Sequence, residues 1–425
     1  MRFTQLQDWL DWQQTLHPVA VDLKLERIAA VADRLQWLPV KSCVITVAGT
    51  NGKGSTVAIL EAILLAAGYR VGCYTSPHLC RYNERIRINR QPVTDAVLCT
   101  AFEAIDAARH TTTLSYFEFG TLAALHIFSQ STLDVLLLEV GMGGRLDAVN
   151  IVPPQLAIIT TIDLDHTEYL GTTREQIGTE KAGIFRAHTP AVCGDIHPPA
   201  SIAETAQHLN APLWQYQRDF HYTTTATGWQ WHQATQTLTL PYPNLAGPHQ
   251  LQNASTALMA LHCLQERLPI PIEAYSLGLQ QIQHPGRLQT LVTPKGTHLL
   301  DVAHNPEGAR ALATALQALP IPGKTYALFS ALSDKDIAAM LAPLAPLIDT
   351  WLIAPLQDTP RATTAPLLID HCQRQGLKFR NYPTLTVAYQ QLLPQLTSQD
   401  RVVIFGSFHT VAECLPLIQP VEPGE

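Results

Sequence analysis

The stretch LDVLLLEV, residues 133–140, is apolar on both of the faces that a β-strand would present. Successive side chains of a strand point to opposite sides of the sheet, so such a strand must be covered on both sides. Helices packed on the two faces of a parallel sheet provide that cover. The stretch therefore predicts a central strand of a mostly parallel α/β sheet.

The same order of apolar strand, Gly-rich or polar turn and helix recurs along the chain. Residues 44–48, 70–74 and 156–162 are further apolar runs of strand length, and residues 57–68 have helical character up to Gly68, a residue that commonly ends helices. In a parallel α/β sheet, ligands bind beyond the carboxyl ends of the strands. The segments that follow these runs are therefore candidate sites.

The pattern changes between residues 196 and 250, where Thr, Gln, Trp and His alternate, as in WQWHQATQTLTL. This alternation predicts an antiparallel ribbon appended to the first sheet. A helix is expected from about Leu251, and Pro285 with Gly286 then interrupts the pattern.

At 425 residues the chain exceeds the size at which one hydrophobic core stops growing, which favours two domains. We place the boundary at residues 283–287. The first domain is expected to span residues 1–283 and the second, smaller and Rossmann-like, residues 287–425. No G-x-G-x-x-G follows a strand of the second domain, so a dinucleotide-binding role is not expected there.

Composition narrows the classes of protein. With 46% hydrophobic and 15% charged residues, the chain is typical of a soluble globular protein. Its formal net charge of −7 gives no reason to expect a nucleic-acid or membrane partner. The eight Cys form no C-x-x-C pair and are expected to be buried, reduced thiols. With no signal peptide in residues 1–20 and no apolar run that could span a membrane, a cytoplasmic protein is expected.

The segment GTNGKGST, residues 49–56, lies between a predicted strand and a predicted helix. Its three Gly allow the backbone to approach a ligand closely, so that N–H groups can converge on phosphate oxygens at the helix start. Lys53 would neutralise phosphate charge, and Ser55 or Thr56 offers a hydroxyl to Mg²⁺. A turn that binds nothing is the alternative. Strand, helix, glycines and lysine together favour a P-loop for a nucleotide.

Two further segments could meet this loop. EVGMGGRLDAVN begins with Glu139 at the end of the central strand, where its carboxylate could ligate Mg²⁺. A helix cap or a salt bridge is the alternative for a lone Glu, but the glycines that follow favour a site. DLDHTEYLG adds His166, which alone would be an ordinary turn residue. TSPHL adds Ser76 after another strand.

Lys181 lies in TEKAGIF, before an apolar stretch. A helical Lys is usually a solvated surface charge. A Lys directed toward an apolar interior has a lowered pKa, which makes its amine available for covalent modification.

Nine segments together resemble the folylpolyglutamate synthase and dihydrofolate synthase family of the ATP-dependent Mur-type amino-acid ligases. They follow the family's order over most of the chain: GTNGKGS, TSPHLCRYNERI, YFEFGTLAAL, EVGMGGRLDAVNI, DLDHTEYLG, EKAGIF, HPGRLQ, DVAHNPEGA and GSFHTVAE. The resemblance implies an N-terminal P-loop ATPase domain of the Mur-ligase type and a C-terminal glutamate-ligase domain.

The resemblance also implies roles for individual residues. It assigns ATP binding to Gly52, Lys53, Gly54, Ser55, Thr56, Asn253, Arg287 and Asp301. It assigns two Mg²⁺ ions to Ser76, Glu139 and His166. Lys181 resembles a carbamylated lysine, and Lys53, His166 and His304 are the other expected catalytic residues. A pterin pocket is expected at Ser115, Tyr116, Phe117, Glu118, Leu146, Asp147 and Ala148, and the incoming glutamate at His304 and Ser407. Lys24 and Val149 depart from the family's usual residues.

The activity implied is ligation of L-glutamate to dihydropteroate and to reduced folates by a monomer, with an acyl phosphate formed from ATP. A Mur-type ligase acting on another carboxylate is the alternative, although a cell-wall precursor ligase would carry a nucleotide-sugar domain before the loop. A GTPase switch would need N-K-x-D, which we do not find. A kinase has no use for the DVAHNP and GSFHT segments.

Overall fold

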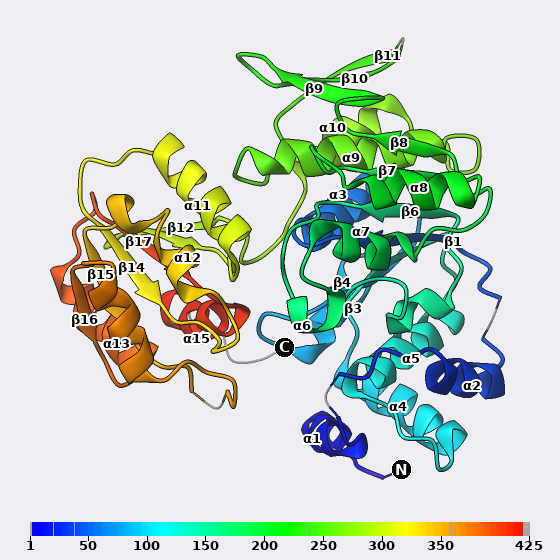
Figure 1. Ribbon diagram of the computed structural model, residues 1–425, viewed down its shortest axis with the longest axis horizontal. Helices are drawn as coiled ribbons and strands as arrows, with labels where there is room; N and C mark the ends of the chain where they lie inside the picture. Colours follow the sequence, from blue (N-terminus) through cyan, green and yellow to red (C-terminus); the bar gives the residue numbers. More distant parts are fainter. Residues whose placement is uncertain (1, 20, 38, 235, 358, 420–425) are drawn as a thin grey trace. The chain divides into compact units, whose positions relative to one another are not determined.

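The structure, a computed structural model, divides into two compact units (Figure 1). The first comprises Met1–Asn244 and Leu251–Ile282, and the second comprises Leu245–Gln250 and Gln283–Glu425. The residues described are 2–19, 21–37, 39–234, 236–357 and 359–419.

The first unit contains helices on both sides of a large sheet. Its helices are α1 (Leu6–Leu16), α2 (Glu26–Leu35), α3 (Lys53–Ala66), η1 (Tyr82–Arg85), α4 (Asp95–Arg109), α5 (Tyr116–Ser129), η2 (Ala148–Ile151), α6 (Thr167–Leu170), α7 (Arg174–Ala182), α8 (Ala200–His208), α9 (His249–Cys263) and α10 (Ile272–Gln280). Its strands are β1 (Cys43–Ala48), β2 (Val71–Tyr74), β3 (Ile86–Ile88), β4 (Gln91–Pro92), β5 (Val135–Glu139), β6 (Leu156–Ile159), β7 (Ala191–Cys193), β8 (Leu213–Gln215), β9 (Phe220–Thr224), β10 (Trp229–Gln233) and β11 (Gln236–Leu240).

The large sheet has the order β4-β3-β2-β5-β1-β6-β7-β8. Neighbouring strands pair in parallel along the series β2-β5-β1-β6-β7-β8. Strand β3 pairs antiparallel with both β2 and β4. Strand β5, which forms from the LDVLLLEV stretch, lies between β1 and β2 and is buried along its length. The predicted mostly parallel sheet with this strand inside it is confirmed.

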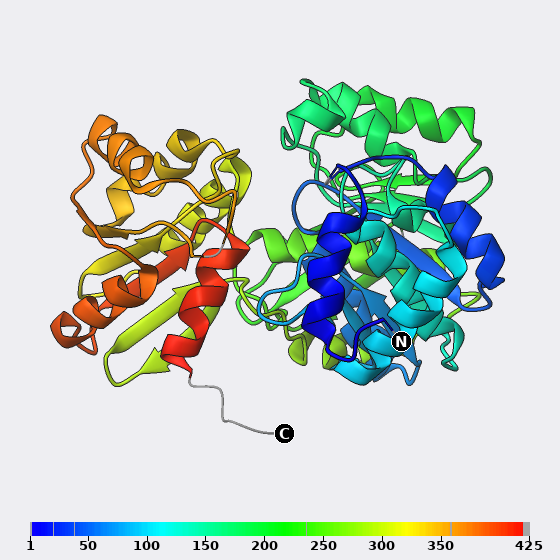
Figure 2. The ribbon, with the colours of Figure 1, turned by 90° about the horizontal axis from the view of Figure 1, so that it is seen from below.

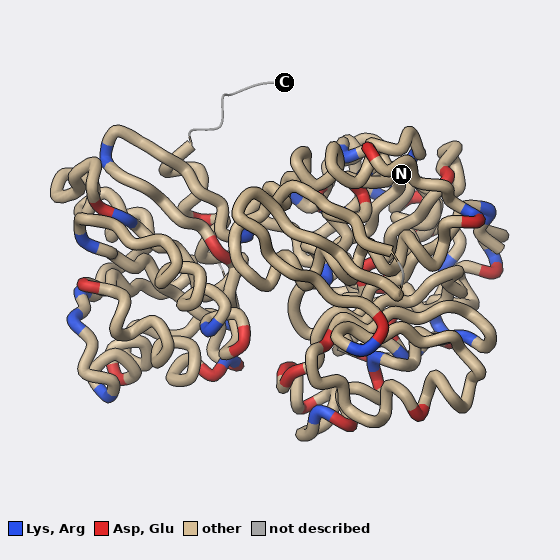
Figure 3. Tube along the Cα trace, turned by 90° about the horizontal axis from the view of Figure 1, so that it is seen from above, with Lys and Arg blue, Asp and Glu red and all other residues tan. Residues whose placement is uncertain are grey.

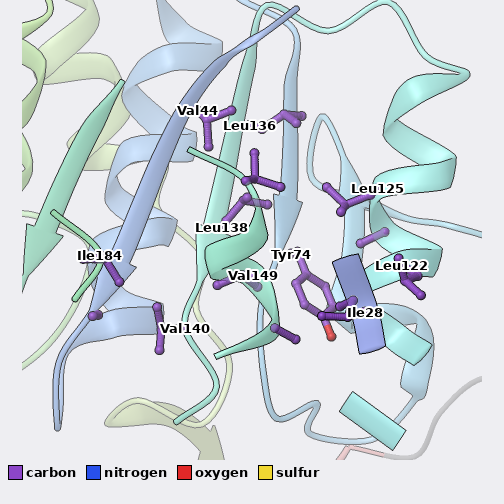
Figure 4. Close-up of a cluster of buried hydrophobic side chains, with 14 of the residues drawn as sticks. Ile28, Val44, Tyr74, Leu122, Leu125, Leu136, Leu138, Val140, Val149 and Ile184 are labelled. Carbon is purple, nitrogen blue, oxygen red and sulfur yellow. The ribbon is translucent and has the colours of Figure 1, made fainter. Parts of the chain in front are cut away.

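The alternation of side chains in the strands sends two sets of apolar residues to opposite faces. Val44, Leu136, Leu138 and Tyr74 belong to one buried cluster with Ile28 of α2 and Leu122 and Leu125 of α5 (Figure 4). Residues of α1 and α4 belong to the same cluster. Helix α3 packs against β1, β2 and β5, and α10 packs on α3. The central strands β1, β2 and β5 are therefore held between helical layers.

Helix α3 begins at Lys53, directly after the glycine loop, and ends at Ala66, with Gly68 following in a left-handed conformation (φ 88°). Gly278 of α10 lies against the α3 backbone, because a Cβ there would come within 2.6 Å of Ile63 Cα. The close approach of these two helices fixes the direction of the helix that starts at the loop.

The ribbon predicted within residues 196–250 is confirmed as the antiparallel strands β9, β10 and β11. It forms a sheet of its own instead of extending the large sheet. The first part of that segment differs from the expectation, since it forms α8 and then β8, which pairs in parallel with β7. Trp229 and Trp231 are buried beneath the ribbon, which explains the alternation seen in the sequence.

The second unit has a six-stranded sheet of order β12-β13-β17-β14-β15-β16, parallel except for the edge strand β12. Its strands are β12 (Gln289–Thr293), β13 (Gly296–Leu300), β14 (Thr325–Phe329), β15 (Thr350–Ile353), β16 (Phe379–Asn381) and β17 (Arg401–Phe405). Its helices are α11 (Pro306–Ala318), α12 (Ile337–Leu341), η3 (Ala345–Leu347), α13 (Ala365–Arg374), α14 (Leu385–Leu392), η4 (Leu393–Gln395) and α15 (Phe408–Ile418).

This second sheet is also covered on both faces (Figure 2). Helices α11, α12 and α13 share a buried cluster with Leu299, Phe329 and Val403. On the other face, α14 and α15 pack against β14 and β17. The predicted Rossmann-like α/β organisation is confirmed.

The charged residues, the cysteines and the helices can be compared with what the composition predicts. Lys and Arg lie interspersed with Asp and Glu in both units (Figure 3). All eight Cys are free and six are buried, but Cys80 is exposed, contrary to the expectation of buried thiols, because it lies in the loop that follows β2. Across the described residues, the helices are too short or too polar for any of them to cross a membrane.

Candidate active site

Four strands of the first sheet end at the same edge. Val47 of β1 is level with Glu139 of β5, Tyr74 of β2 is level with Leu138, and Ala48 is level with Ile159 of β6. The segments that follow these strands contain the glycine loop, Ser76, the Glu139 loop and the segment of His166. Because parallel strands present their carboxyl ends on one side, these segments leave the sheet together.

The glycine loop is shaped by its conformation and by its neighbours. Gly52 has φ 82°, a value that other residues adopt with strain, and a Cβ there would lie 2.5 Å from Asn253 Oδ1. Asn253 is therefore in close contact with the loop. The Lys53 ammonium donates to the carbonyls of Gly49 (2.9 Å) and Thr50 (3.0 Å), so it folds back over the loop.

The start of α3 carries hydroxyl groups in an enclosed position. No side chain caps this helix, and its first residues include Ser55 and Thr56, both buried. Thr56 Oγ1 has no hydrogen-bond partner among the described residues. An uncapped helix N-terminus with a buried, unsatisfied hydroxyl suits a phosphate and its bound cation.

Backbone and hydroxyl contacts tie the loop to the segment after β6. Thr50 N donates to Thr161 O at 2.7 Å, and Thr160 Oγ1 donates to Asn51 O at 2.6 Å. Asp163 N donates to Thr50 Oγ1 at 3.0 Å. His166 follows three residues later in a left-handed conformation, with its Nε2 3.8 Å from Asp165 Oδ2.

Glu139 and Ser76 are brought together. Glu139 is 4% exposed, and Ser76 N donates to Glu139 Oε2 at 3.3 Å. Glu139 is therefore no surface salt-bridge residue. Among the described residues, no group of three or more His, Cys, Asp or Glu is arranged to hold a metal ion. A cation at this edge would depend on hydroxyl, carboxylate and phosphate oxygens, which are the ligands that Mg²⁺ prefers.

Lys181 is buried, with 3% of its surface exposed, so a solvated surface charge is excluded for it. It lies near the end of α7, beside the glycines that follow β5. A Cβ at Gly144 would come within 2.8 Å of Lys181 O, and Arg145 N donates to Glu180 O at 2.8 Å. These contacts place α7 against the Glu139 loop.

The Ser115–Glu118 segment begins α5 with a capping box. Ser115 Oγ accepts from Glu118 N, and the Glu118 carboxylate accepts from Ser115 N at 2.8 Å and pairs with Arg27 at 3.1 Å. The ring of Phe117 lies against Gly141, where a Cβ would come within 2.5 Å of Phe117 Cζ. This segment is therefore joined to the Glu139 loop through an aromatic ring. Tyr116 lies between Ser115 and Phe117, partly buried.

Asp147 is a buried carboxyl within the same loop, between the partly exposed Leu146 and the buried Ala148. Burial raises the pKa of Asp147 to about 7, while hydrogen bonds from the N–H groups of Met142 and Val149 and the charge of Lys53 act in the opposite direction. Its Oδ2 accepts from Met142 N at 2.8 Å. Asp147 therefore lies within the electrostatic reach of the loop lysine.

The predicted residues of the second unit gather around Phe408. The Arg287 guanidinium lies over the Phe408 ring at 4.9 Å, and the His304 ring centroid is 5.8 Å from it. Burial raises the pKa of Asp301, and the nearby Arg287 opposes this shift. Ser407 is the N-cap of α15, and its Oγ accepts from Thr410 N at 2.9 Å.

Two contacts, one in each unit, are not evident from the sequence. The ring of Phe408 contacts Arg287 and His304. In the sequence, its position within the GSFHT segment was the signal for a role at this site. Arg85, in the YNERI segment, lies over the rings of Tyr82 and Tyr116. Its proximity to Tyr82 in the chain was the available signal.

Comparison with known proteins bears on this arrangement. The Mur ligase middle domain family matches residues 47–261, and the Mur ligase glutamate ligase domain family matches residues 286–408. The fold and its sheet-edge loops thus define an ATP-dependent amino-acid ligase of the Mur type.

Full-length relatives narrow this class. Dihydrofolate synthase/folylpolyglutamate synthase of Escherichia coli is 42% identical over 99% of this chain and 97% of its own length. The structure of E. coli FolC in complex with DHPP and ADP matches with a TM-score of 0.92, covering 98% of each chain at 42% identity. A bifunctional folylpolyglutamate synthase/dihydrofolate synthase with Mn, AMPPNP and L-glutamate bound matches with a TM-score of 0.90 at 46% identity, covering 97% of this chain and 98% of that one.

The chain belongs to the dihydrofolate synthase/folylpolyglutamate synthase family of Mur ligases. The resemblance inferred from the nine segments is confirmed.

Proposed function

We propose that this chain ligates L-glutamate to dihydropteroate and to reduced folates with consumption of ATP, at the carboxyl edge of the first sheet. One observation carries the proposal: Ser76 and Glu139 are in contact at the edge where the Lys53 loop begins α3. The ligands seen in the related structures, DHPP, ADP, AMPPNP, Mn and L-glutamate, support the same substrates here.

The first task of the site is to hold a triphosphate. Gly52, Gly54 and the first N–H groups of α3 face the phosphates, Ser55 and Thr56 add hydroxyl donors, and Lys53 supplies the positive charge. Ser76, Glu139 and His166 would hold two Mg²⁺ ions, which offset the charge that develops on the transferred phosphoryl group. Asn253, Arg287 and Asp301 would bind the rest of the nucleotide.

The second task is to activate a carboxylate. A carboxylate is a poor electrophile toward amines, so its oxygen attacks the γ-phosphorus of ATP, ADP leaves, and an acyl phosphate forms. Lys53 and the loop N–H groups stabilise the charge on this phosphoryl group, a positioning and electrostatic contribution. Lys181, once carbamylated, would add a carboxylate at the same place.

The third task is amide formation. L-glutamate would be bound by His304 and Ser407, and its amino group attacks the acyl carbon, expelling phosphate. The pterin end of the substrate would lie at Ser115–Glu118 and Leu146–Ala148, with its ring stacked on Phe117 and its N–H groups donating to Asp147. The partial enclosure of Phe117 and the burial of Asp147 suit an aromatic ring with polar edges.

The test is a direct assay. Purified protein is incubated with ATP, Mg²⁺, dihydropteroate and L-glutamate, and ADP and dihydrofolate are measured. We expect both products in equal amounts, and a glutamate-extended product when tetrahydrofolate replaces dihydropteroate. ADP release that instead requires a UDP-linked peptide would assign the chain to a different carboxylate substrate and overturn the proposal.

A further inference from the structure

We infer that Arg85 binds the second carboxylate of a glutamate-bearing folate, the one that lies beside the carboxylate being extended. Arg85 would thereby favour reduced folates over dihydropteroate. This inference rests on the proposed function and deepens it, since it concerns which substrate the same site prefers.

Arg85 is held by aromatic rings. Its guanidinium carbon lies 5.3 Å from the centroid of Tyr82 and 5.7 Å from that of Tyr116, and its Nε donates to His78 Nδ1 at 2.8 Å. Its own carbonyl accepts from Thr75 N at 2.9 Å, which fixes the backbone. Ring faces attract a cation without neutralising it. The guanidinium is therefore positioned but keeps its full charge.

The described residues provide no carboxylate partner for Arg85. Of its five N–H donors, the contact with His78 uses one. The remaining fork matches the two oxygens of a carboxylate. The guanidinium is therefore equipped to bind an anionic group from outside the chain.

Other cations near this edge are already engaged. Arg27 pairs with Asp22 and Glu118, Arg87 with Glu61, and Arg145 with Glu180. Lys53 is assigned to the phosphates. Compared with these four cations, Arg85 is the one still available for a substrate carboxylate.

The location of Arg85 suits this role. His78, its hydrogen-bond partner, follows Ser76 by two residues, and Ser76 contacts Glu139. Tyr116, one of its two rings, belongs to the segment assigned to the pterin. Arg85 therefore contacts both the segment that carries Ser76 and the segment assigned to the pterin.

The two substrates differ in what they would offer to Arg85. Dihydropteroate has one carboxylate, and that group reacts with ATP. A reduced folate has two on its glutamate, so one stays ionised in the site while the other reacts. An ionised carboxylate taken from water without a partner is strongly disfavoured, and a bidentate arginine removes that cost.

The experiment compares KM for tetrahydrofolate and for dihydropteroate in Arg85→Gln, Arg85→Lys and the matched control Arg81→Gln. Arg81 lies four residues earlier, its side chain is 70% exposed, and it pairs with Asp95. For Arg85→Gln we expect KM for tetrahydrofolate to rise about 10- to 100-fold, the loss typical of hydrogen bonds to a charged group, with a much smaller rise for dihydropteroate. Arg85→Lys should give an intermediate rise, and Arg81→Gln should behave like the parent protein.

A second measurement does not depend on how the variants fold. The unaltered protein is assayed with tetrahydrofolate whose α-carboxylate is replaced by a carboxamide. We expect KM to rise about as much as it does in Arg85→Gln, and the carboxamide to cause little further rise in that variant, as in a double-mutant cycle.

Equal rises for both substrates in Arg85→Gln, or an unchanged KM for the carboxamide in the unaltered protein, would overturn the inference while leaving the proposed function intact. Failure of the unaltered protein to use either substrate would instead overturn the proposed function and the inference with it.

Discussion

The predicted sites of the two units differ in the kinds of side chain that form them. In the first, charged groups are buried: Glu139 at the end of β5, Asp147 in the loop that follows, and Lys181 in α7, while Lys53 folds over the glycine loop. In the second, Arg287 and His304 lie against the aromatic ring of Phe408. Removing one partner of a buried charge pair costs several kcal/mol, because the other charge is left buried and unpaired. A contact between aromatic rings contributes only about 0.5–1.5 kcal/mol. Under the proposed function, the buried charges of the first unit would act on the phosphoryl group, and the ring contacts of the second unit would position a substrate.

The strongest test of this difference is removal of the Lys53 charge, which we propose acts on the phosphates. For Lys53→Ala we expect kcat to fall by at least about 10³-fold, because no other side chain of the loop can offset the transferred charge. Turnover is measured by ADP release, with thermal unfolding followed to verify the fold. Lys41→Ala, which removes an exposed lysine before β1, is the control and should be fully active. An unchanged kcat in Lys53→Ala would contradict the role of the loop.

The next largest effect is expected at the buried lysine of α7. Lys181→Ala should lower kcat by about 10²-fold if a carbamate acts beside the phosphates, and short carboxylic acids should restore part of the activity by replacing the lost carboxylate. Rates are measured with and without added acetate. Adding acetate to the unaltered protein should have no effect. A crystal grown with bicarbonate in which the side chain ends at a bare amine would count against the carbamate.

The raised pKa of Asp147 predicts a pH dependence of intermediate size. If Asp147 binds the pterin as proposed, only its ionised carboxylate can accept hydrogen bonds from the pterin N–H groups. The value of kcat/KM for dihydropteroate should then rise about tenfold between pH 6 and 8, with a midpoint near the Asp147 pKa of about 7. Asp147→Asn should remove this pH dependence. A midpoint that persists in the variant would assign it to another group.

The same shift has a consequence for stability. Because the native state favours protonated Asp147, its contribution to stability is complete below the unfolded-state pKa of about 3.9 and is lost as the pH rises through about 7. Denaturant unfolding at several pH values should therefore show the parent protein losing stability over this range relative to Asp147→Asn.

The smallest effect is expected in the second unit. Phe408→Leu removes a ring that contacts Arg287 and His304, and KM for L-glutamate should rise about 3- to 10-fold, with kcat changed less, as expected for contacts of about 0.5–1.5 kcal/mol. Phe379→Leu, in β16, replaces another ring of the same unit and is the matched control. If Phe408→Leu were as damaging as Lys53→Ala, the contrast between the two units would be wrong.

Much of the fold was predictable because its signals are local. The apolar runs of β1, β5 and β6 and the glycines of the loop appear directly in the sequence. The separate ribbon sheet was less accessible, since alternation predicts a strand but not its partner. Likewise, residues 245–250 belong to the second unit although they precede most of α9, a grouping that contacts decide and local patterns do not.

The site was predictable where residues follow strands and not where partners come from elsewhere. Ser76 and Glu139 were expected at one edge, and the structure brings them into contact. The place of Arg85 depends on two rings, one of them 31 residues away, so spacing could not indicate it. The burial of Lys181 likewise depends on how α7 meets the Glu139 loop.

The contact between Gly278 and Ile63 makes the orientation of the phosphate loop dependent on a residue more than two hundred positions downstream. The methyl group of an alanine at position 278 would clash with Ile63 and push α3 away from α10. The loop that precedes α3 would move with the helix, although position 278 touches no substrate. A substitution in the buried contact between α10 and α3 can therefore reduce catalysis. Mutagenesis confined to the residues at the sheet edge would miss such a position.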